Sequence, residues 1–304
     1  MDWLVGVAAF AVFVLVAVAA WYFWWLFPKR QVETFRPTIT DPKDRADVEN
    51  NFRSTISQVL GGAAVIAGAA LGVWQFLLQQ QAAQDLLVSN QIAKGFEELG
   101  QEQLGLRVGG LFELEGVMKI SKQYHQPILE TLTLFVRITN MAGIACPPLP
   151  GGAQSPSVDI EVALTILGRR DHRLDAGDGA DLHGAKICGA DLNHAHFEGD
   201  QFDQAHLEGA NFTDAHLDRA RLNGAYLEDV HFDDATLTGA DLTGATLNAN
   251  TIFTGADMKN TDLSDVNLSG TDISDAQVSA ACGAGIIRPT RHLQTTPRAC
   301  PPDH

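Results

Sequence analysis

Residues 205–224 read AHLEGANFTDAHLDRARLNG, and they repeat with a period of five. Within this stretch Ala stands at every fifth position from 205, and Leu or Phe at every fifth position from 207. An amphipathic helix repeats about every 3.6 residues and a half-buried strand every two, so neither pattern fits. The apolar position recurs from Leu182 to Ile252 and resumes, one residue out of step, from Met258 to Val278. All 20 of these positions are apolar, and Ala stands two residues before 14 of them.

This pattern of two inward and three outward residues predicts a chain that turns a corner at every pentad and closes a square coil after four. Residue i then lies over residue i+20, at about the 4.8 Å spacing of paired strands. Twenty pentads predict about five coils of a solenoid, in which each coil contacts only its neighbours. The apolar centres predicted to form the core include Leu182, Leu192, Phe202, Leu207, Phe212, Leu217, Leu222, Leu227, Phe232 and Leu242.

Two inward positions depart from the pattern. Asp200 occupies a small inward position, where a buried carboxylate is costly unless it is hydrogen-bonded. We expect it to accept bonds from turn amides, with a binding role as the alternative. Asn250 occupies another such position, and we expect the one-residue slip to follow it as a bulge around Thr254–Gly255.

The ADLHG, ANFTD and ADLTG pentads (180–184, 210–214 and 240–244) resemble the right-handed quadrilateral β-helix of pentapeptide-repeat proteins. Segments before the repeats resemble the membrane-anchored bacterial members of that family. These segments are VENNFRSTISQVLGG (48–62), KGFEELG (94–100), LRVGGLFELEGV (106–117), LTLFVR (132–137) and VALTILGRRD (162–171). The chain departs from the family pattern at 90–92, where Asn-Gln-Ile replaces Glu-Arg-Phe, and at Gly116, which replaces Arg. The resemblance supplies no catalytic residue to transfer.

The N-terminal region contains two candidate transmembrane helices. Residues 4–27 form an uncharged run of about 24 residues, long enough to cross a ~30 Å hydrocarbon core, with Trp and Tyr gathered at its far end. A cleaved signal peptide is the alternative, but the first residues carry no Lys or Arg and the run is too long. Residues 56–78 form the second candidate. In it Ala64, Gly68 and Gly72 make a small-residue ridge, either for assembly of several chains or for packing on the first span.

The segment between the two spans carries six basic residues, whereas the N-terminus carries none. By the positive-inside rule this basic loop is cytoplasmic. If both segments cross, we expect a two-pass protein of the cell inner membrane with the β-helix outside the cytoplasm. A second helix that lies on the membrane without crossing it would instead leave the β-helix inside.

The remaining composition predicts six segments. They are a membrane anchor at 1–80, an α-helical module at 81–145, a Pro/Gly linker at 146–157, a short helix at 158–170, the β-helix at 171–282 and a C-terminal tail at 283–304. Cys146 and Cys188 suit structural thiols. A disulfide between Cys282 and Cys300 is expected only if the C-terminal part meets an oxidising compartment.

The charge is concentrated in the repeats. The whole chain carries −16, and residues 171–280 alone contain 21 Asp and Glu against 5 Lys and Arg, which is also −16. His196 and His216 are 20 residues apart and should stack on one wall, whereas His206 should lie on the opposite wall between Lys186 and Tyr226. A stacked His pair could bind Zn²⁺ or titrate near pH 6, but no Cys or third His joins it in the sequence. We therefore predict solvated wall positions and no metal site.

The sequence contains no GxSxG, Walker, HExxH or GxGxxG pattern. A closed rod also offers no pocket for paired carboxylates. We therefore expect no enzyme and no cofactor. The leading hypothesis is a membrane-tethered scaffold that presents an acidic rod to a protein partner.

Two other functions remain open. The first is mimicry of duplex DNA toward a DNA-binding enzyme such as gyrase, as is thought for some cytosolic pentapeptide-repeat proteins. The second is a membrane effector that assembles through its transmembrane helices. Direct binding of nucleic acid is not expected, whereas contact with the lipid bilayer is. Formation of a homo-oligomer stays open.

Overall fold

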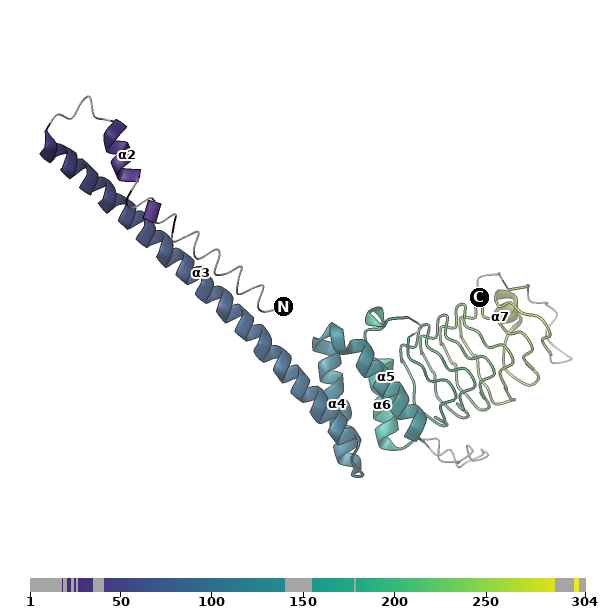
Figure 1. Cartoon of the computed structure of the whole chain (residues 1–304). Helices are drawn as coiled ribbons and strands as arrows, with labels where there is room; N and C mark the ends of the chain where they lie inside the picture. The colour runs from purple at the N-terminus through teal and green to yellow at the C-terminus, as the bar shows by residue number, and fades with distance from the viewer. Residues whose placement is uncertain are drawn as a thin grey trace. The chain divides into compact units, whose positions relative to one another are not determined.

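A computed structural model describes residues 18, 21–22, 25, 27–34, 41–139, 155–177, 179–287 and 298–300. The chain divides into two compact units, Met1–Asp85 and Leu86–His304, each described by itself below. The helices of the described part are α2 (Phe27–Thr34), α3 (Pro42–Leu99), α4 (Leu104–Ile120), α5 (Lys122–Thr139), α6 (Val158–Gly168) and α7 (Asp275–Ala280), with a 3₁₀ turn, η2, at His172–Leu174 (Figure 1).

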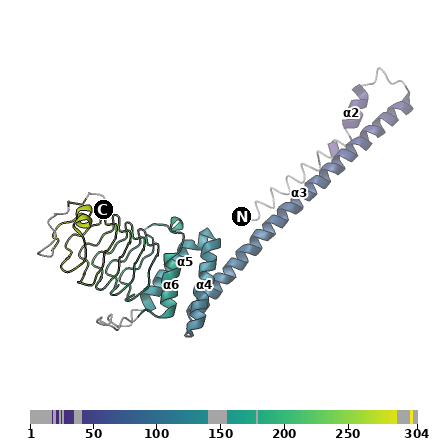
Figure 2. The ribbon, with the colours of Figure 1, turned by 180° about the vertical axis from the view of Figure 1, so that it is seen from behind.

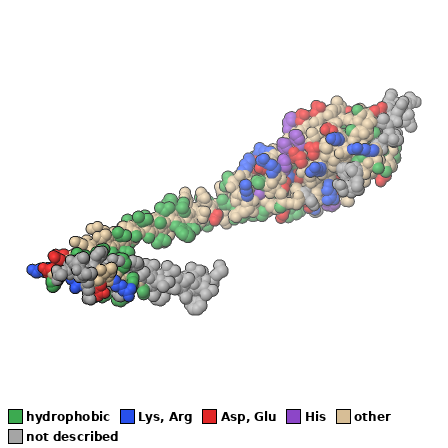
Figure 3. All heavy atoms as spheres, turned by 90° about the horizontal axis from the view of Figure 1, so that it is seen from above, with side chains coloured by type: hydrophobic (Ala, Val, Ile, Leu, Met, Phe, Trp, Pro, Cys, Tyr) green, Lys and Arg blue, Asp and Glu red, His purple; other side chains and the backbone are tan. Residues whose placement is uncertain are grey.

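Helix α3 is 58 residues long and includes the second predicted span. It is the one helix of the described residues that is long and apolar enough to cross a membrane. Its apolar side chains are exposed, for example Val65 and Ile66 at 73% each, and Figure 3 shows hydrophobic side chains gathered along it. The first predicted span lies mostly outside the described residues.

The expected loop between the two spans is partly helical, which corrects the sequence prediction. Residues 27–34 form α2, and the charged segment from Pro42 onward is the first part of α3. Its charges suit a helix because opposite charges four residues apart face each other. Arg53 and Glu49 make such a pair at 2.5 Å.

The second unit begins with a small helical core. The end of α3 packs on α4 through two glycines, because a Cβ on Gly110 would lie 2.6 Å from the carbonyl oxygen of Gly95. Helices α4, α5 and α6 contact one another and bury Leu114, Leu132 and Leu164 completely. Figures 1 and 2 show these helices at one end of the stack of coils and α7 at the other.

Parallel bridges between residues 20 apart build the β-helix. One wall runs from Asp181 to Gln201 and Arg221, and each rung is held by paired backbone hydrogen bonds, such as Leu182 N–H to the Gln201 carbonyl at 2.8 Å. The second residue of most turns has a positive φ and is either Gly or a polar residue such as Asp214 (φ 56°). The structure therefore contains the β-helix that the five-residue period predicts.

The interior of the coils contains the small and large residues of each pentad. All ten centres named from the sequence are between 0 and 2% exposed. Phe212, Phe232 and Phe253 stack through the core, with ring centroids 5.4 and 5.2 Å apart. Such burial of Leu and Phe contributes about 1.5–3 kcal/mol per side chain, so the interior is the main source of stability.

The insertion in the repeats lies earlier than the sequence suggested. Ile252 bridges His231 from the outward position, and Phe253 is the buried centre. Asn250 is exposed, and Thr251 takes the small inward position, from which its hydroxyl donates to the Leu227 carbonyl at 2.8 Å. The extra residue is therefore accommodated at 248–250 and not around Thr254–Gly255. Two gains explain this register: the hydroxyl finds an acceptor, and an aromatic ring joins the core stack.

The C-terminal end of the β-helix also differs from the prediction. The last predicted pentad, around Val278, is the helix α7, which covers the end of the stack while Gln277 donates to the Phe253 carbonyl at 2.6 Å. The bridge pattern continues past residue 282, because Ile287 pairs with Asn267. The predicted tail thus begins with residues that belong to the ladder. A disulfide joins Cys282 to Cys300, whose Cα atoms are 4.8 Å apart.

Candidate functional site at the junction of the helices and the first coil

Helix α6 ends against the first coil of the β-helix. The carbonyl of Gly168, its last residue, accepts from the His196 N–H at 2.7 Å. A Cβ at this position would lie 2.7 Å from the Cβ of Ala195, so only glycine permits this approach without a shift of the backbone. The two residues that follow, Arg169 and Arg170, are thereby placed between the helices and the coils.

Arg170 is buried in this junction and links three segments. Its guanidinium donates to Asp175 at 2.7 Å, to Asp200 at 2.6 Å and to the Leu167 carbonyl at 2.7 Å. The side chains of Arg170 and Asp200 are both 0% exposed. His125 on α5 extends the network, since its Nε2 lies 2.7 Å from Asp175.

Burial governs the electrostatics of this network. It raises the pKa of Asp200 to about 6, although Arg170 and the Ala180 N–H oppose the shift. Burial alone would lower the pKa of Arg170, but the negative charges of Asp200 and Asp175 reverse this and raise it. One oxygen of Asp200 has no hydrogen-bond partner. The junction therefore contains a buried charge whose state can change below neutral pH.

The sequence predicted one of the two kinds of partner that Asp200 has in the structure. Its carboxylate does accept from a turn amide, Ala180 N–H at 2.8 Å, but its main partner is Arg170. Arg170 lies before the first pentad, so the five-residue period gave no indication of this partner.

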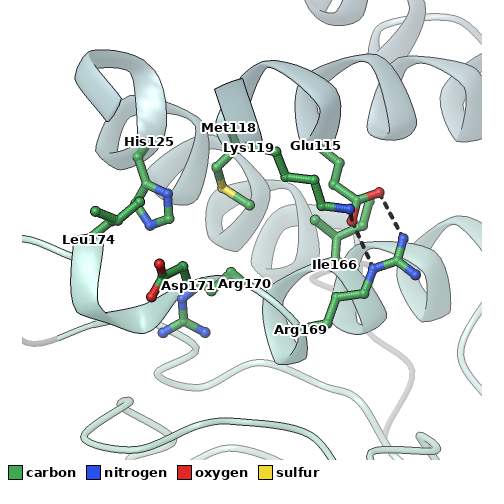
Figure 4. Close-up of a pocket in the computed structure, with 9 residues that line it drawn as sticks. All are labelled: Glu115, Met118, Lys119, His125, Ile166, Arg169, Arg170, Asp171 and Leu174. Carbon is green, nitrogen blue, oxygen red and sulfur yellow. Dashed lines mark hydrogen bonds and ion pairs between the residues drawn. The ribbon is translucent and has the colours of Figure 1, made fainter. Parts of the chain in front are cut away.

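A pocket of about 260 Å³ lies beside this network (Figure 4). On one side Glu115 of α4 receives two hydrogen bonds from Arg169, at 2.8 and 2.7 Å, and pairs with Lys119 at 2.7 Å. Burial would raise the pKa of Glu115, but these two cations hold it below its usual value. The remaining lining residues include Met118, Ile166 and Leu174.

The ionisable side chains that line this pocket are paired with one another or with immediate neighbours. Asp171 pairs with Arg173 at 2.8 Å, and His125 with Asp175. A nucleophile or general base needs a free or activated group beside an open site. The pairing therefore supports a structural joint between the helices and the coils, and it does not support acid–base chemistry.

The predicted histidine column is present and longer than expected. His196 and His216 stack with ring centroids 4.5 Å apart, and His172 stacks on His196 at 6.0 Å. Glu198 also lies close to His172 and His196. His172 is thus a third His beside the predicted pair, which corrects the expectation that no third His joins it, although His216 is not in this group of possible ligands. The sequence could not show it, because His172 precedes the repeats and lies 24 residues from His196.

The other predicted residues lie apart from the junction. Lys186, His206 and Tyr226 share one wall, as predicted, and the rings of His206 and Tyr226 stack at 4.3 Å. Ala64, Gly68 and Gly72 are exposed on α3, and no described residue comes within 4 Å of a Cβ built on either glycine.

Comparison with known families identifies the repeats. Residues 182–226 match the model "Pentapeptide repeats (9 copies)", and residues 210–248 and 249–281 match "Pentapeptide repeats (8 copies)". The C-terminal part of the chain is therefore a pentapeptide-repeat β-helix. No curated protein sequence matches the chain.

Solved structures of pentapeptide-repeat proteins are also similar. HetL, a protein of heterocyst differentiation regulation from Nostoc sp. strain PCC 7120, is 23% identical over 36% of this chain, with a TM-score of 0.19. Rfr23 from Cyanothece 51142 is 21% identical over 40% of this chain and 69% of its own, with a TM-score of 0.17. Full-length QnrB1, a plasmid-mediated fluoroquinolone resistance protein, is 13% identical over 37% of this chain and 78% of its own, with a TM-score of 0.18. The match spans 61% of HetL.

Proposed function

We propose that this chain is a non-enzymatic, membrane-tethered scaffold that presents its acidic β-helix to a protein partner outside the cytoplasm. The observation that carries the proposal is the exposed apolar stretch of α3. No residue of its most apolar 18-residue window is buried. A soluble helix with this composition would normally bury one face in a core.

The dimensions of this stretch suit a bilayer. Residues 56–78 form 23 residues of continuous helix, and at 1.5 Å per residue they extend about 35 Å, enough for a hydrocarbon core of about 30 Å. The surrounding residues are polar or charged, with Arg53 before the stretch and Asp85 after it. Together with the predicted span at 4–27, this helix would make a two-pass anchor in the inner membrane.

Two independent features favour an extracytoplasmic β-helix. The basic segment between the spans obeys the positive-inside rule if it faces the cytoplasm. The disulfide between Cys282 and Cys300 is the second feature, because disulfides persist in oxidising compartments and are rare in the cytosol. A cytoplasmic DNA mimic would need the opposite orientation, so this pair of features disfavours the mimic.

The surface of the β-helix supports recognition of a protein. Residues 171–280 carry a net charge of −16, and the face seen in Figure 3 shows acidic side chains interspersed with His, Lys and Arg. A field of one sign accelerates encounter with an oppositely charged surface and repels nucleic acid. We therefore expect a partner with a basic surface. Assembly of several chains through Ala64, Gly68 and Gly72 is compatible with this function.

Membrane topology provides the test. Because Cys300 is disulfide-bonded, labelling of its thiol would first require reduction, and reporter fusions are more direct. We expect alkaline phosphatase fused after residue 304 to be active, and green fluorescent protein at the same place to stay dark. The protein should also remain in the membrane fraction after a carbonate wash.

The converse result would overturn the proposal. A fluorescent C-terminus with inactive phosphatase would place the β-helix in the cytoplasm, and DNA-binding enzymes would then be the first partners to test. Release of the chain by carbonate would remove the membrane tether itself. A fusion after Arg36 provides a control for the loop, which should show the opposite reporter pattern.

A further inference from the structure

We propose that His172, His196 and Glu198 form a binding site for a divalent transition-metal ion, with Zn²⁺ as the best fit. The three side chains come from two segments that the fold brings together. His172 lies in η2 before the repeats, and the other two belong to one pentad of the first coil. Their ligand atoms all lie within 4.8 Å of one another.

The distances within the group approach those of a tetrahedral site. Two ligands on one Zn²⁺ with bonds of about 2.0–2.1 Å are about 3.3 Å apart. Here His196 Nδ1 lies 3.0 Å from one oxygen of Glu198, and His172 Nδ1 lies 3.7 Å from the other. The rings of His172 and His196 lie nearly parallel, at an interplanar angle of 18°, so the side chains must rotate to direct these atoms to a common centre.

The carboxylate provides a second, independent indication of a ligand. The Oε2 atom of Glu198 is buried and has no hydrogen-bond partner, although the carboxylate as a whole is 23% exposed. An acceptor without a partner carries a desolvation penalty. A metal ion between Glu198 and His172 would satisfy this oxygen.

The site is held in place by its surroundings. The backbone of His196 is fixed because its N–H donates to the Gly168 carbonyl, and its ring stacks on His216 with an interplanar angle of 2°. The turn that carries His172 is stabilised by Asp171, which accepts from the Arg173 N–H at its start. These contacts restrict the backbone at both histidines, so the entropy lost when the ion binds comes mainly from the side chains.

The neighbouring charges do not oppose a cation. The pocket around the site is also lined by Arg169, Arg170 and Arg173. Each of these is paired with a carboxylate, namely Glu115, Asp200 and Asp171. Glu198 is paired with the two histidines and not with an arginine.

Two histidines and one glutamate leave one tetrahedral position open. The same ligand set supports bound water in several zinc proteins. His172 and His196 are 39% and 44% exposed, so an ion bound here would be accessible from solvent. It would accept water or a donor from the partner surface, and the ion would join η2 to the first coil.

The test is a zinc titration of the full-length, untagged protein in detergent micelles after removal of metal with a chelator. Competition with a chromogenic zinc chelator at neutral pH measures stoichiometry and affinity. We expect one Zn²⁺ per chain, with affinity that decreases as pH falls because protons compete for the imidazoles. His172→Ala and Glu198→Gln should each weaken binding at least about tenfold.

His231→Ala is the matched control. His231 also contacts a carboxylate two residues later, Asp233 at 3.3 Å, but it belongs to no group of three ligands among the described residues. It should bind zinc like the wild type. The proposal fails if the wild type binds no stoichiometric zinc, if both ligand variants keep wild-type affinity, or if His231→Ala loses as much affinity as they do. Circular dichroism of each variant shows whether lost binding reflects unfolding.

Discussion

The buried carboxylate of Asp200 leads to a prediction about pH. Its pKa is about 6 in the folded chain, against 3.8 for an ordinary Asp. Because the folded pKa is higher, the folded state binds the proton more tightly than the unfolded state does. The contribution of this carboxyl group to the stability of the folded state is fully present below pH 3.8 and is lost as pH rises through 6. Replacing it by the neutral isostere, Asp200→Asn, should remove that dependence.

The size of the effect follows from the difference between the two pKa values. A difference of about 2.2, at 1.36 kcal/mol per pKa unit, corresponds to about 3 kcal/mol in total. Most of this change, about 2 kcal/mol, falls between pH 4 and pH 7. The groups that face the carboxylate are the Arg170 guanidinium, Asp175 and the Ala180 amide.

Hydrogen–deuterium exchange of the full-length protein measures this locally. Amides that bond to the first coil report the opening free energy at the junction, for example Gln201 N–H, which donates to the Ala180 carbonyl at 3.0 Å. After correction for intrinsic exchange rates, the opening free energy of these amides in the wild type should fall by about 2 kcal/mol relative to Asp200→Asn from pH 4 to pH 7. Peptides around Leu242 should show no such difference.

Asp203→Asn is the matched control, since Asp203 belongs to the same pentad as Asp200 and pairs with Arg221, whose side chain is exposed. Its pH profile should follow that of the wild type. Parallel pH profiles of the opening free energy for the wild type and Asp200→Asn would refute the reasoning. They would mean that Asp200 titrates alike in the folded and unfolded states.

Three further predictions concern the coils. Leu207→Asp should abolish cooperative thermal unfolding of the β-helix, since Leu207 is 0% exposed. Leu207→Met should lower the free energy of unfolding by less than about 1.5 kcal/mol. A wild-type melting curve for the Asp variant would refute the register. Gly255→Ala should be more destabilising than Gly244→Ala in denaturant melts. Both glycines have positive φ, but only Gly255 lacks room for a Cβ. Equal losses of unfolding free energy in the two variants would contradict the close contact at Gly255. Replacing Cys282 and Cys300 by Ser should cost about 3 kcal/mol of stability for an 18-residue separation. The loss would be measured as faster hydrogen–deuterium exchange near residue 282. Unchanged exchange would show that the disulfide does not constrain the C-terminal end of the β-helix.

The five-residue period was sufficient to predict the β-helix because it reports a geometric requirement. Each coil has room for one small and one large side chain per wall, and close packing does not tolerate many exceptions. Ala210 and Phe212 show this, since both are 0% exposed. The period could therefore place the inward residues of nearly every coil without information on distant contacts.

The same reasoning could not locate the inserted residue. Composition alone allows either Ile252 or Phe253 as the centre, because both are large and apolar. The choice depends on the Leu227 carbonyl, which accepts from Thr251, and on the ring of Phe232, which stacks on Phe253. Both partners lie about one coil earlier in the chain, so a local pattern does not contain them.

The junction was the least predictable part, because its residues obey no period. Asp175 and Asp200 lie 5 and 30 residues after Arg170 in the sequence. Each charge is acceptable in the interior only because the others are present. A solenoid needs its ends covered, and a cap made only of apolar side chains could pack in several rotational settings. A buried ion pair whose members lie on different segments is satisfied in one setting. Arg170 thus fixes the orientation of the helices on the first coil, and with it the placement of His172 beside Glu198.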